Sequence, residues 1–284
     1  MEVIREAEAF RKRTSAARAD DASVGLVPTM GAFHAGHTAL IERARKENDL
    51  LAVSIFVNPL QFAAGEDFEH YPRNEEEDLA KAEQGRADVA FVPSKEEMLG
   101  ASDLAVTVDP GPLGDLYEGA SRPGHFRGVL TVVARLFSFT GPSRSYFGEK
   151  DFQQLYLIRR MVSDLAIDAD VVAVPTVREP GGLALSSRNA YLSEEEHDVA
   201  GSLFEALADA AERARQGERN AAVLRAEMAR TIASHDRARL DYAAIVDEET
   251  FEEVGTLHGS ARALVAARIG TTRLIDNLRL EPPS

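Results

Sequence analysis

The hydrophobic positions in the first two-thirds of the chain alternate between short continuous runs and helical stripes. Apolar and β-branched runs predict strands at residues 24–29, 50–57, 88–93 and 171–177. Apolar positions three and four apart predict helices between them, at residues 38–48, 74–84, 124–139 and 151–165. In the run 50–57 only Ser54 is polar, which favours a central parallel strand. This rhythm predicts an α/β fold built on a doubly wound parallel sheet.

Capping residues mark three of the predicted helix starts. Asn74, followed by Glu77 three positions later, predicts an N-cap with an acidic third helical residue. Asp151 is expected to cap the helix that follows it, and Ser193 with Glu196 opens a further helix.

The pattern changes after residue 178. A Gly/Pro break at residues 179–183 predicts a hinge around Gly181 and Gly182. Beyond it we expect one long helix from Ser193 to about residue 216 and a second over about residues 221–234. Strands are expected at 240–246, 263–269 and 272–278. The prediction is therefore a Rossmann-like domain over residues 1–178 and a smaller α+β lid domain over residues 179–284.

Composition narrows the class of protein. The 284 residues contain no cysteine, which excludes disulfides, thiolate zinc sites and cysteine nucleophiles. Lys and Arg number 32 against 47 Asp and Glu, and the net charge of −15 disfavours nucleic-acid binding. No apolar stretch approaches the roughly 20 residues of a membrane span, and the charged N-terminus lacks a signal-peptide pattern. We expect a soluble cytoplasmic protein without nucleic-acid or membrane partners.

The segment between the first predicted strand and its helix carries the strongest chemical signal. It reads Pro-Thr-Met-Gly-Ala-Phe-His-Ala-Gly-His over residues 28–37. Glycines let the backbone approach a ligand closely, and a helix N-terminus favours phosphate. His34 and His37, three apart, can both donate hydrogen bonds to phosphate oxygens. Two alternatives are solvated loop histidines and a two-histidine metal site, which lacks a third ligand nearby in sequence.

Further polar segments follow other predicted elements. Asn58 and Gln61 place amide groups after the second strand, although Asn-Pro also starts ordinary turns. Lys150 precedes a helix and can reach phosphate, although lysines usually lie on solvated faces. Arg188 follows two serines on a loop suited to clamping phosphates. The cluster at residues 122–127 is equally compatible with a functional site and with a helix entry.

Together these segments resemble the pantoate–β-alanine ligase (pantothenate synthetase) family, within the nucleotidylyltransferase superfamily that has the His-x-Gly-His signature. The signature alone would also fit cytidylyltransferases and class I aminoacyl-tRNA synthetases. Five further blocks, in order, are similar to this one family, and the resemblance covers almost the whole chain. The matching blocks are residues 30–37, 56–62, 71–73, 122–128, 147–154 and 185–189.

The resemblance implies a two-step reaction. ATP and pantoate form pantoyl adenylate with loss of pyrophosphate, and the β-alanine amine then displaces AMP to give pantothenate. It also implies that ATP is a substrate, that Mg²⁺ is required and that the protein is a homodimer. Two rivals stay open. One is a transferase that leaves the nucleotide on its product, and the other is a non-catalytic nucleotide-binding protein.

The resemblance also implies roles for individual residues. His37 is the expected catalytic imidazole and His34 assists it, while Lys150 and Arg188 supply positive charge. The residues expected to bind ATP are Met30, Gly31, Ala32, Phe33, His34, Ala35, Gly36, His37, Gly148, Glu149, Lys150, Asp151, Val177, Leu185, Ser186, Ser187 and Arg188.

The remaining implied contacts concern pantoate and the metal. Gln61 and Gln154 are expected to hold pantoate, with Gln61 also near the β-alanine site. Asp78 stands where the family places a magnesium contact.

Overall fold

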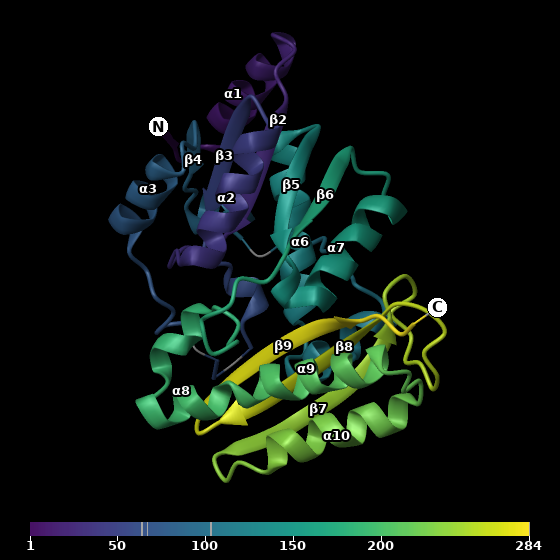
Figure 1. The fold of residues 1–284 in the computed structure, drawn as a ribbon. Helices are drawn as coiled ribbons and strands as arrows, with labels where there is room; N and C mark the ends of the chain where they lie inside the picture. Colours follow the sequence, from purple (N-terminus) through teal and green to yellow (C-terminus); the bar gives the residue numbers. More distant parts are fainter. Residues whose placement is uncertain (64, 67, 103, 284) are drawn as a thin grey trace. The chain divides into compact units, whose positions relative to one another are not determined.

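The computed structural model describes residues 1–63, 65–66, 68–102 and 104–283. The chain divides into two units, Met1–Pro175 and Thr176–Ser284. The first unit is built on a six-stranded parallel sheet, four of whose strands the hydrophobic runs predict (Figure 1). Its strands are β1 (Glu2–Ile4), β2 (Val24–Thr29), β3 (Leu50–Ile55), β4 (Val89–Phe91), β5 (Ser143–Gly148) and β6 (Ala169–Val174).

The strand order is β1-β4-β3-β2-β5-β6. From β2 the sheet grows first through β3 and β4 toward one edge, and then through β5 and β6 toward the other. The direction of growth therefore reverses between β2 and β5. Such a switch point is where open α/β sheets bind ligands, outside the carboxyl ends of the strands.

Helices cover both faces of this sheet, which is the doubly wound arrangement predicted. On one face α2 packs on β2, β3 and β5, and α3 packs against α2; on the other face α1 and α6 pack on β2 (Figure 1). No helix in the part of the chain that the structure describes is long and apolar enough to cross a membrane. The helices of this unit are α1 (Ala7–Ala19), α2 (Ala35–Glu47), α3 (Glu75–Gln84), α4 (Lys95–Leu99), α5 (Glu118–Ser121), α6 (His125–Thr140) and α7 (Phe152–Asp164).

Among the described helices of this unit, α2, α3 and α4 begin with a side-chain cap. The Asn74 side chain accepts a hydrogen bond from the Glu77 amide at 3.3 Å, so the predicted cap of α3 is confirmed. Asp151 is the N-cap residue of α7, as predicted, but its side chain makes no capping hydrogen bond. A short 3-10 turn, Glu149–Asp151, leads directly into α7.

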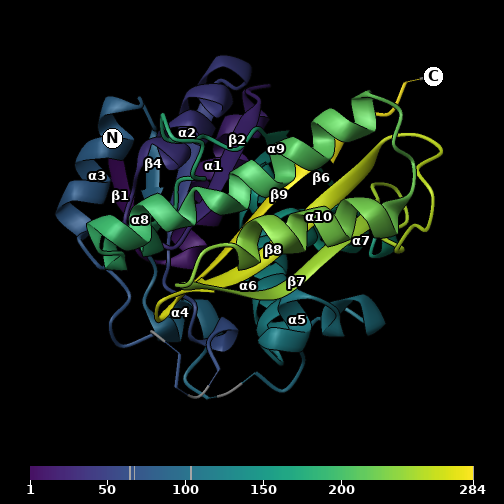
Figure 2. The same ribbon diagram turned by 60° about the horizontal axis from the view of Figure 1, so that its bottom comes forward.

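The second unit is a three-stranded antiparallel sheet, β7 (Ala238–Asp247), β8 (Ala261–Ile269) and β9 (Thr272–Leu280). Helices α9 (Ser202–Arg215) and α10 (Ala221–Ala233) lie along one face of it (Figure 2). The long helix predicted from Ser193 is interrupted, because Gly201 separates α8 (Glu194–Ala200) from α9. Glycine weakens a helix interior, and the break falls there.

The boundary between the units lies three residues before the predicted one. Arg178 already belongs to the second unit, since its guanidinium contacts both carboxylate oxygens of Asp276 on β9, at 2.6 and 2.9 Å. The Gly/Pro break then forms a turn in which the Gly182 amide donates to the Glu179 carbonyl oxygen at 2.8 Å. The ion pair and the turn fix the start of the second unit to its own sheet.

Candidate functional site

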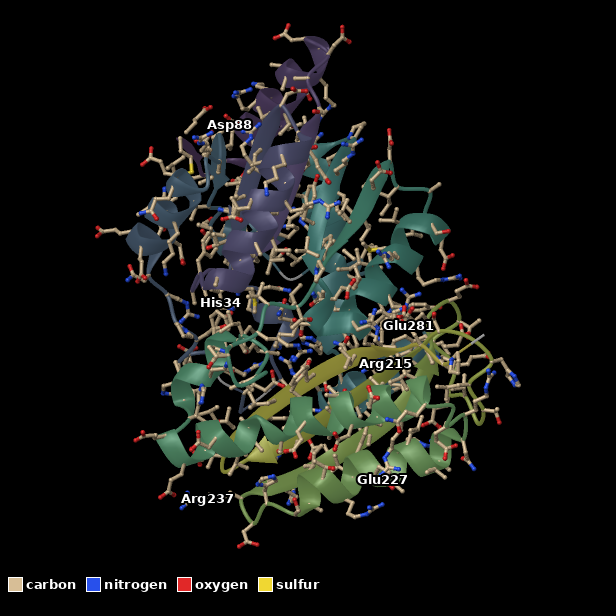
Figure 3. The ribbon with its side chains drawn as sticks, viewed as in Figure 1. His34, Asp88, Arg215, Glu227, Arg237 and Glu281 are labelled. Atoms are coloured by element: carbon tan, nitrogen blue, oxygen red, sulfur yellow. The ribbon has the colours of Figure 1, made fainter. Side chains whose placement is uncertain are left out.

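Three of the predicted chemical segments follow three neighbouring strands. Residues 30–37 follow β2, residues 56–62 follow β3 and residues 149–151 follow β5. Because these strands are parallel, their carboxyl ends lie on the same edge of the sheet, at the switch point. Figure 3 labels His34 at this edge, at the start of α2. The topology therefore brings distant parts of the sequence to one place.

The two signature histidines cap α2 reciprocally. His34 is the N-cap residue, and its Nδ1 accepts a hydrogen bond from the Gly36 amide at 3.1 Å. The amide of His34 in turn donates to Nδ1 of His37 at 3.3 Å. The two ring centroids are 4.3 Å apart. Since Nδ1 accepts in both rings, the neutral tautomers carry their protons on Nε2, which is left as the remaining donor of each ring.

Burial keeps these imidazoles neutral. The pKa of His37 is lowered to about 3, mainly by burial and then by the neighbouring His34 ring. The pKa of His34 is also lowered, first by burial and then by the positive charges of Lys150 and Lys81. Both rings are therefore uncharged hydrogen-bond donors at neutral pH. The charge of Lys150 thus acts on His34, and its contact with a nucleotide stays a prediction.

Gln61 is held by a buried amide. Asn58 donates from Nδ2 to Gln61 Oε1 at 3.0 Å and to the Gly128 carbonyl oxygen at 3.0 Å. Gly128 has no room for a side chain, because a Cβ atom there would lie 2.2 Å from the carbonyl oxygen of Leu60. With its Oε1 engaged by Asn58, the side chain of Gln61 keeps its NH₂ group for a ligand oxygen.

The cluster at residues 122–127 also contacts Gln61, and sequence reasoning left its role undecided. His125 Nδ1 donates to the Gln61 carbonyl oxygen at 2.9 Å, and Arg122 donates to the same oxygen at 3.2 Å. Arg122 also forms a two-bond pair with Glu66, at 2.7 and 2.8 Å. Burial and the Arg122 charge lower the pKa of His125 to about 4. Sequence reasoning missed Glu66, because its partner lies 56 positions away in the chain.

Two adjacent glutamines on α7 have different surroundings. Gln153 is buried, accepts from the Glu118 amide at 3.1 Å and donates to the carbonyl oxygens of Leu113 and Leu116 at 2.9 Å each. Its side chain is therefore used by the backbone. Gln154, the residue predicted to hold pantoate, is half-buried in the first turn of the helix. Its contact with pantoate stays a prediction.

Asp78 is only 2% exposed and contacts the loop of residues 30–34 between β2 and α2, here called the signature loop. Its Oδ2 accepts from the Ala32 amide at 2.8 Å and its Oδ1 from the Phe33 amide at 2.7 Å. Mg²⁺ needs near-octahedral oxygen ligation, and no group of three or more His, Cys, Asp or Glu among the described residues could hold a metal ion. The described residues do not by themselves form a resident magnesium site, and the bonds of Asp78 to the loop amides give no support to the magnesium contact that the resemblance implies for it.

The other predicted nucleotide contacts belong to the second unit. The Leu185 amide donates to the Val177 carbonyl oxygen at 3.0 Å, so these two predicted residues are neighbours. Ser186 accepts from the Arg188 amide at 3.3 Å and begins the 3-10 turn Ser187–Tyr191. Asn189 ties this segment to the Ala184 carbonyl oxygen at 3.1 Å. Residues 185–188 therefore form one ordered loop within their unit.

The Rossmann-like sheet, with two histidines capping the helix after its central strand, defines a nucleotide-binding α/β protein. The sequence model of the family described as pantoate-beta-alanine ligase matches residues 2–279. The chain belongs to the pantoate-beta-alanine ligase family, whose name states its reaction, the ligation of pantoate to β-alanine.

Individual relatives agree with this membership. The pantothenate synthetase of Rubrobacter xylanophilus is 50% identical over 285 residues, which cover 98% of each chain. A crystal structure of pantothenate synthetase from Thermus thermophilus superposes with a TM-score of 0.92 at 46% identity, covering 99% of this chain and 100% of that one. The Francisella tularensis pantoate-beta-alanine ligase, solved with β-γ ATP and β-alanine, gives a TM-score of 0.79 at 34% identity, over 98% and 97% of the two chains.

A pH titration tests the neutral state of the two histidines. Because burial lowers both pKa values, we expect NMR signals of His37 to stay in the neutral position down to about pH 5, and His34 to titrate below the ordinary imidazole value of about 6.5. The variants His34→Gln and His37→Gln assign the signals. A His37 midpoint at or above about 6.5 would contradict the neutral pair.

Proposed function

We propose that the chain joins pantoate to β-alanine through a pantoyl adenylate formed from ATP. A pantoate carboxylate oxygen attacks the α-phosphorus, the bond from that phosphorus to the β-phosphate oxygen breaks, and pyrophosphate leaves. The β-alanine amine then attacks the acyl carbon, AMP leaves with the bridging oxygen, and the amine loses a proton. The observation that carries this proposal is the neutral His34–His37 pair at the N-terminus of α2, with the positive charge of Lys150 acting on His34.

The histidine pair suits the first step. Displacement at phosphorus requires alignment and stabilisation of the negative charge that grows on the phosphate oxygens. The Nε2–H groups of His34 and His37 offer two donors at a helix N-terminus, where the helix dipole also favours anions. Because both imidazoles are neutral, their Nε2–H groups donate hydrogen bonds without transferring a proton to the phosphate. The Lys150 ammonium adds positive charge beside them.

The pantoate contacts follow from the amide groups at the end of β3 and the start of α7. Because Oε1 of Gln61 accepts from Asn58, its NH₂ group is left to donate, and this group suits a carboxylate or hydroxyl oxygen of pantoate. Gln154 is proposed as the second pantoate contact.

Residues Val177 and 185–188 are proposed to bind the nucleotide from the second unit, with Arg188 on its phosphates. A guanidinium is suited to phosphate because it donates in a planar, two-bond geometry. The adenylate is prone to hydrolysis, so we propose that the second unit acts as a lid that excludes water.

Product analysis distinguishes this function from its rivals. With ATP, pantoate and β-alanine, we expect AMP and pyrophosphate in equal amounts, and AMP release that depends on β-alanine. A stable nucleotidylated product would instead identify a transferase. ATP binding without pantoate-dependent exchange of pyrophosphate into ATP would identify a non-catalytic nucleotide-binding protein.

Two substitutions test the proposed charge stabilisation. His37→Ala and Lys150→Ala should each lower kcat about 100-fold or more, the scale for loss of one donor to a developing charge. The matched controls are His258→Ala and Lys12→Ala, because both side chains are exposed. We expect wild-type turnover for these controls. Near-normal turnover of either site variant would show that its role is misassigned.

We also propose a homodimer, which rests on the family resemblance and on the general frequency of twofold dimers. Light scattering with size-exclusion chromatography should give twice the mass of one chain across a dilution series. A mass of one chain at every concentration would refute the dimer.

A further inference from the structure

Helix α3 contacts the signature loop at three points. Asp78 and Lys81 are three positions apart on this helix and therefore lie on one side of it. The Asp78 carboxylate accepts from the amides of Ala32 and Phe33 at 2.8 and 2.7 Å. The Lys81 ammonium donates to the Phe33 carbonyl oxygen at 2.6 Å. Both the donor and the acceptor of the Phe33 backbone are thus bound by side chains of α3.

The backbone held in this way is strained. Gly31 has a φ of 87° and Ala32 a φ of 53°, and a non-glycine residue adopts this left-handed region only where its surroundings enforce it. A Cβ atom at Gly31 would lie 2.7 Å from Asp78 Oδ2, so the glycine is required by the approach of the carboxylate. Asp78 accepts from the amide of Ala32 itself and from that of Phe33, the next residue, and these bonds hold the turn that leads to His34.

The Phe33 side chain carries this restraint to the histidine pair. Its ring is 4% exposed and packs in the core beneath α2. It also stacks on His37, with ring centroids 5.1 Å apart and planes 25° apart. A shift of the Phe33 backbone would therefore move a ring that lies against the proposed catalytic imidazole.

We propose that Asp78 and Lys81 are positioning residues for the adenylation step, which hold residues 31–33 so that Phe33 and the capping bonds fix the His34–His37 pair, and that Asp78 is not a magnesium ligand. Both carboxylate oxygens already accept short backbone hydrogen bonds, and the side chain is 2% exposed. The amides of Ala32 and Phe33 therefore serve the fold, and the nucleotide contacts of this loop fall to the histidine rings and the remaining backbone groups.

The first test uses substitutions on α3. Asp78→Asn keeps the shape of the side chain but exchanges one acceptor for a donor, and Lys81→Met keeps its length but removes the bond to Phe33. Each should lower kcat about 10- to 100-fold, as expected for small displacements of catalytic groups, while KM for β-alanine stays unchanged. Lys81→Arg, which retains a donor, should recover most of the activity. Glu76→Gln is the matched control, because Glu76 is exposed on the same helix.

A spectroscopic readout separates positioning from general loss of stability. The His37 ring signals sense the Phe33 ring current, so they should shift in Asp78→Asn and Lys81→Met and stay in place in Lys81→Arg and Glu76→Gln. Unchanged His37 signals together with wild-type kcat in folded Asp78→Asn and Lys81→Met would overturn the proposal. If Asp78→Asn fails to fold, Lys81→Met decides the positioning role alone.

Equilibrium binding tests the statement about magnesium. The Kd of ATP is measured with EDTA and with excess Mg²⁺, for the wild type and for Asp78→Asn. We expect the ratio of the two Kd values to be the same in both proteins, because the metal does not bind Asp78. A ratio that falls toward one in Asp78→Asn would show that Asp78 is a magnesium ligand; if that variant does not fold, Asp78→Ser, which also removes the carboxylate, is measured in its place.

The positioning role rests on the proposed function, and the two can fail separately. A wild-type protein that releases no β-alanine-dependent AMP would refute the proposed function. A wild-type protein that does so, with variants of α3 that match it in kcat and in His37 signals, would refute only the positioning role.

Discussion

The site depends on the way the first amides of α2 find hydrogen-bond acceptors. The N–H groups of a helix's first turn have no partner inside the helix, and short polar side chains usually accept from them. Here two imidazoles do so, each through Nδ1. A serine or aspartate that capped the helix in these positions would have no second ring nitrogen left to donate to a ligand. A histidine has a second nitrogen, so the same bond that caps the helix also selects the tautomer and directs Nε2–H away from the backbone.

This arrangement allows phosphate chemistry in an acidic protein. The net charge of −15 would disfavour polyphosphates at the surface as a whole. At the edge beyond β2 and β5, however, the N-terminus of α2 favours anions. Positive charge also acts there, because the pKa of His34 is lowered first by burial and then by Lys150 and Lys81, while Asp151 acts in the opposite direction. Asp78 lies at the same edge, but two backbone amides bind its carboxylate, which reduces the field it projects toward a ligand.

The sequence predicts those strands and helix caps that depend only on residues close together in the chain. The strand at residues 24–29 and the cap at Asn74 agree with the structure because they depend on a run of apolar residues and on one side chain. The sequence places the start of α2 at residue 38 instead of Ala35, since histidine is not a usual N-cap. It does not reveal strand β5, because the first three residues are polar and pairing with β2 and β6 creates the strand.

For the site, spacing alone brings His34 and His37 together. The contacts of Asp78 and Lys81 with the loop could not be predicted, because they join positions more than 40 residues apart.

The hydrogen bonds that a polar side chain makes within the protein show whether it holds the fold or is left for a ligand. His125 uses both ring nitrogens within the protein, Nδ1 on the Gln61 carbonyl oxygen and Nε2 on Arg122, so this histidine is part of the scaffold. His34 and His37 use one nitrogen each for the helix cap. The same distinction divides the side chains of Gln153 and Gln61. Gln153 bonds to the backbone through both its oxygen and its nitrogen, whereas Gln61 is held through its oxygen by Asn58. The three histidines are the same residue type, as are the two glutamines, so residue type alone does not reveal which of them is left for a ligand. Chemical function follows from which atoms the fold leaves unused, and that is decided by bonds between segments far apart in the chain.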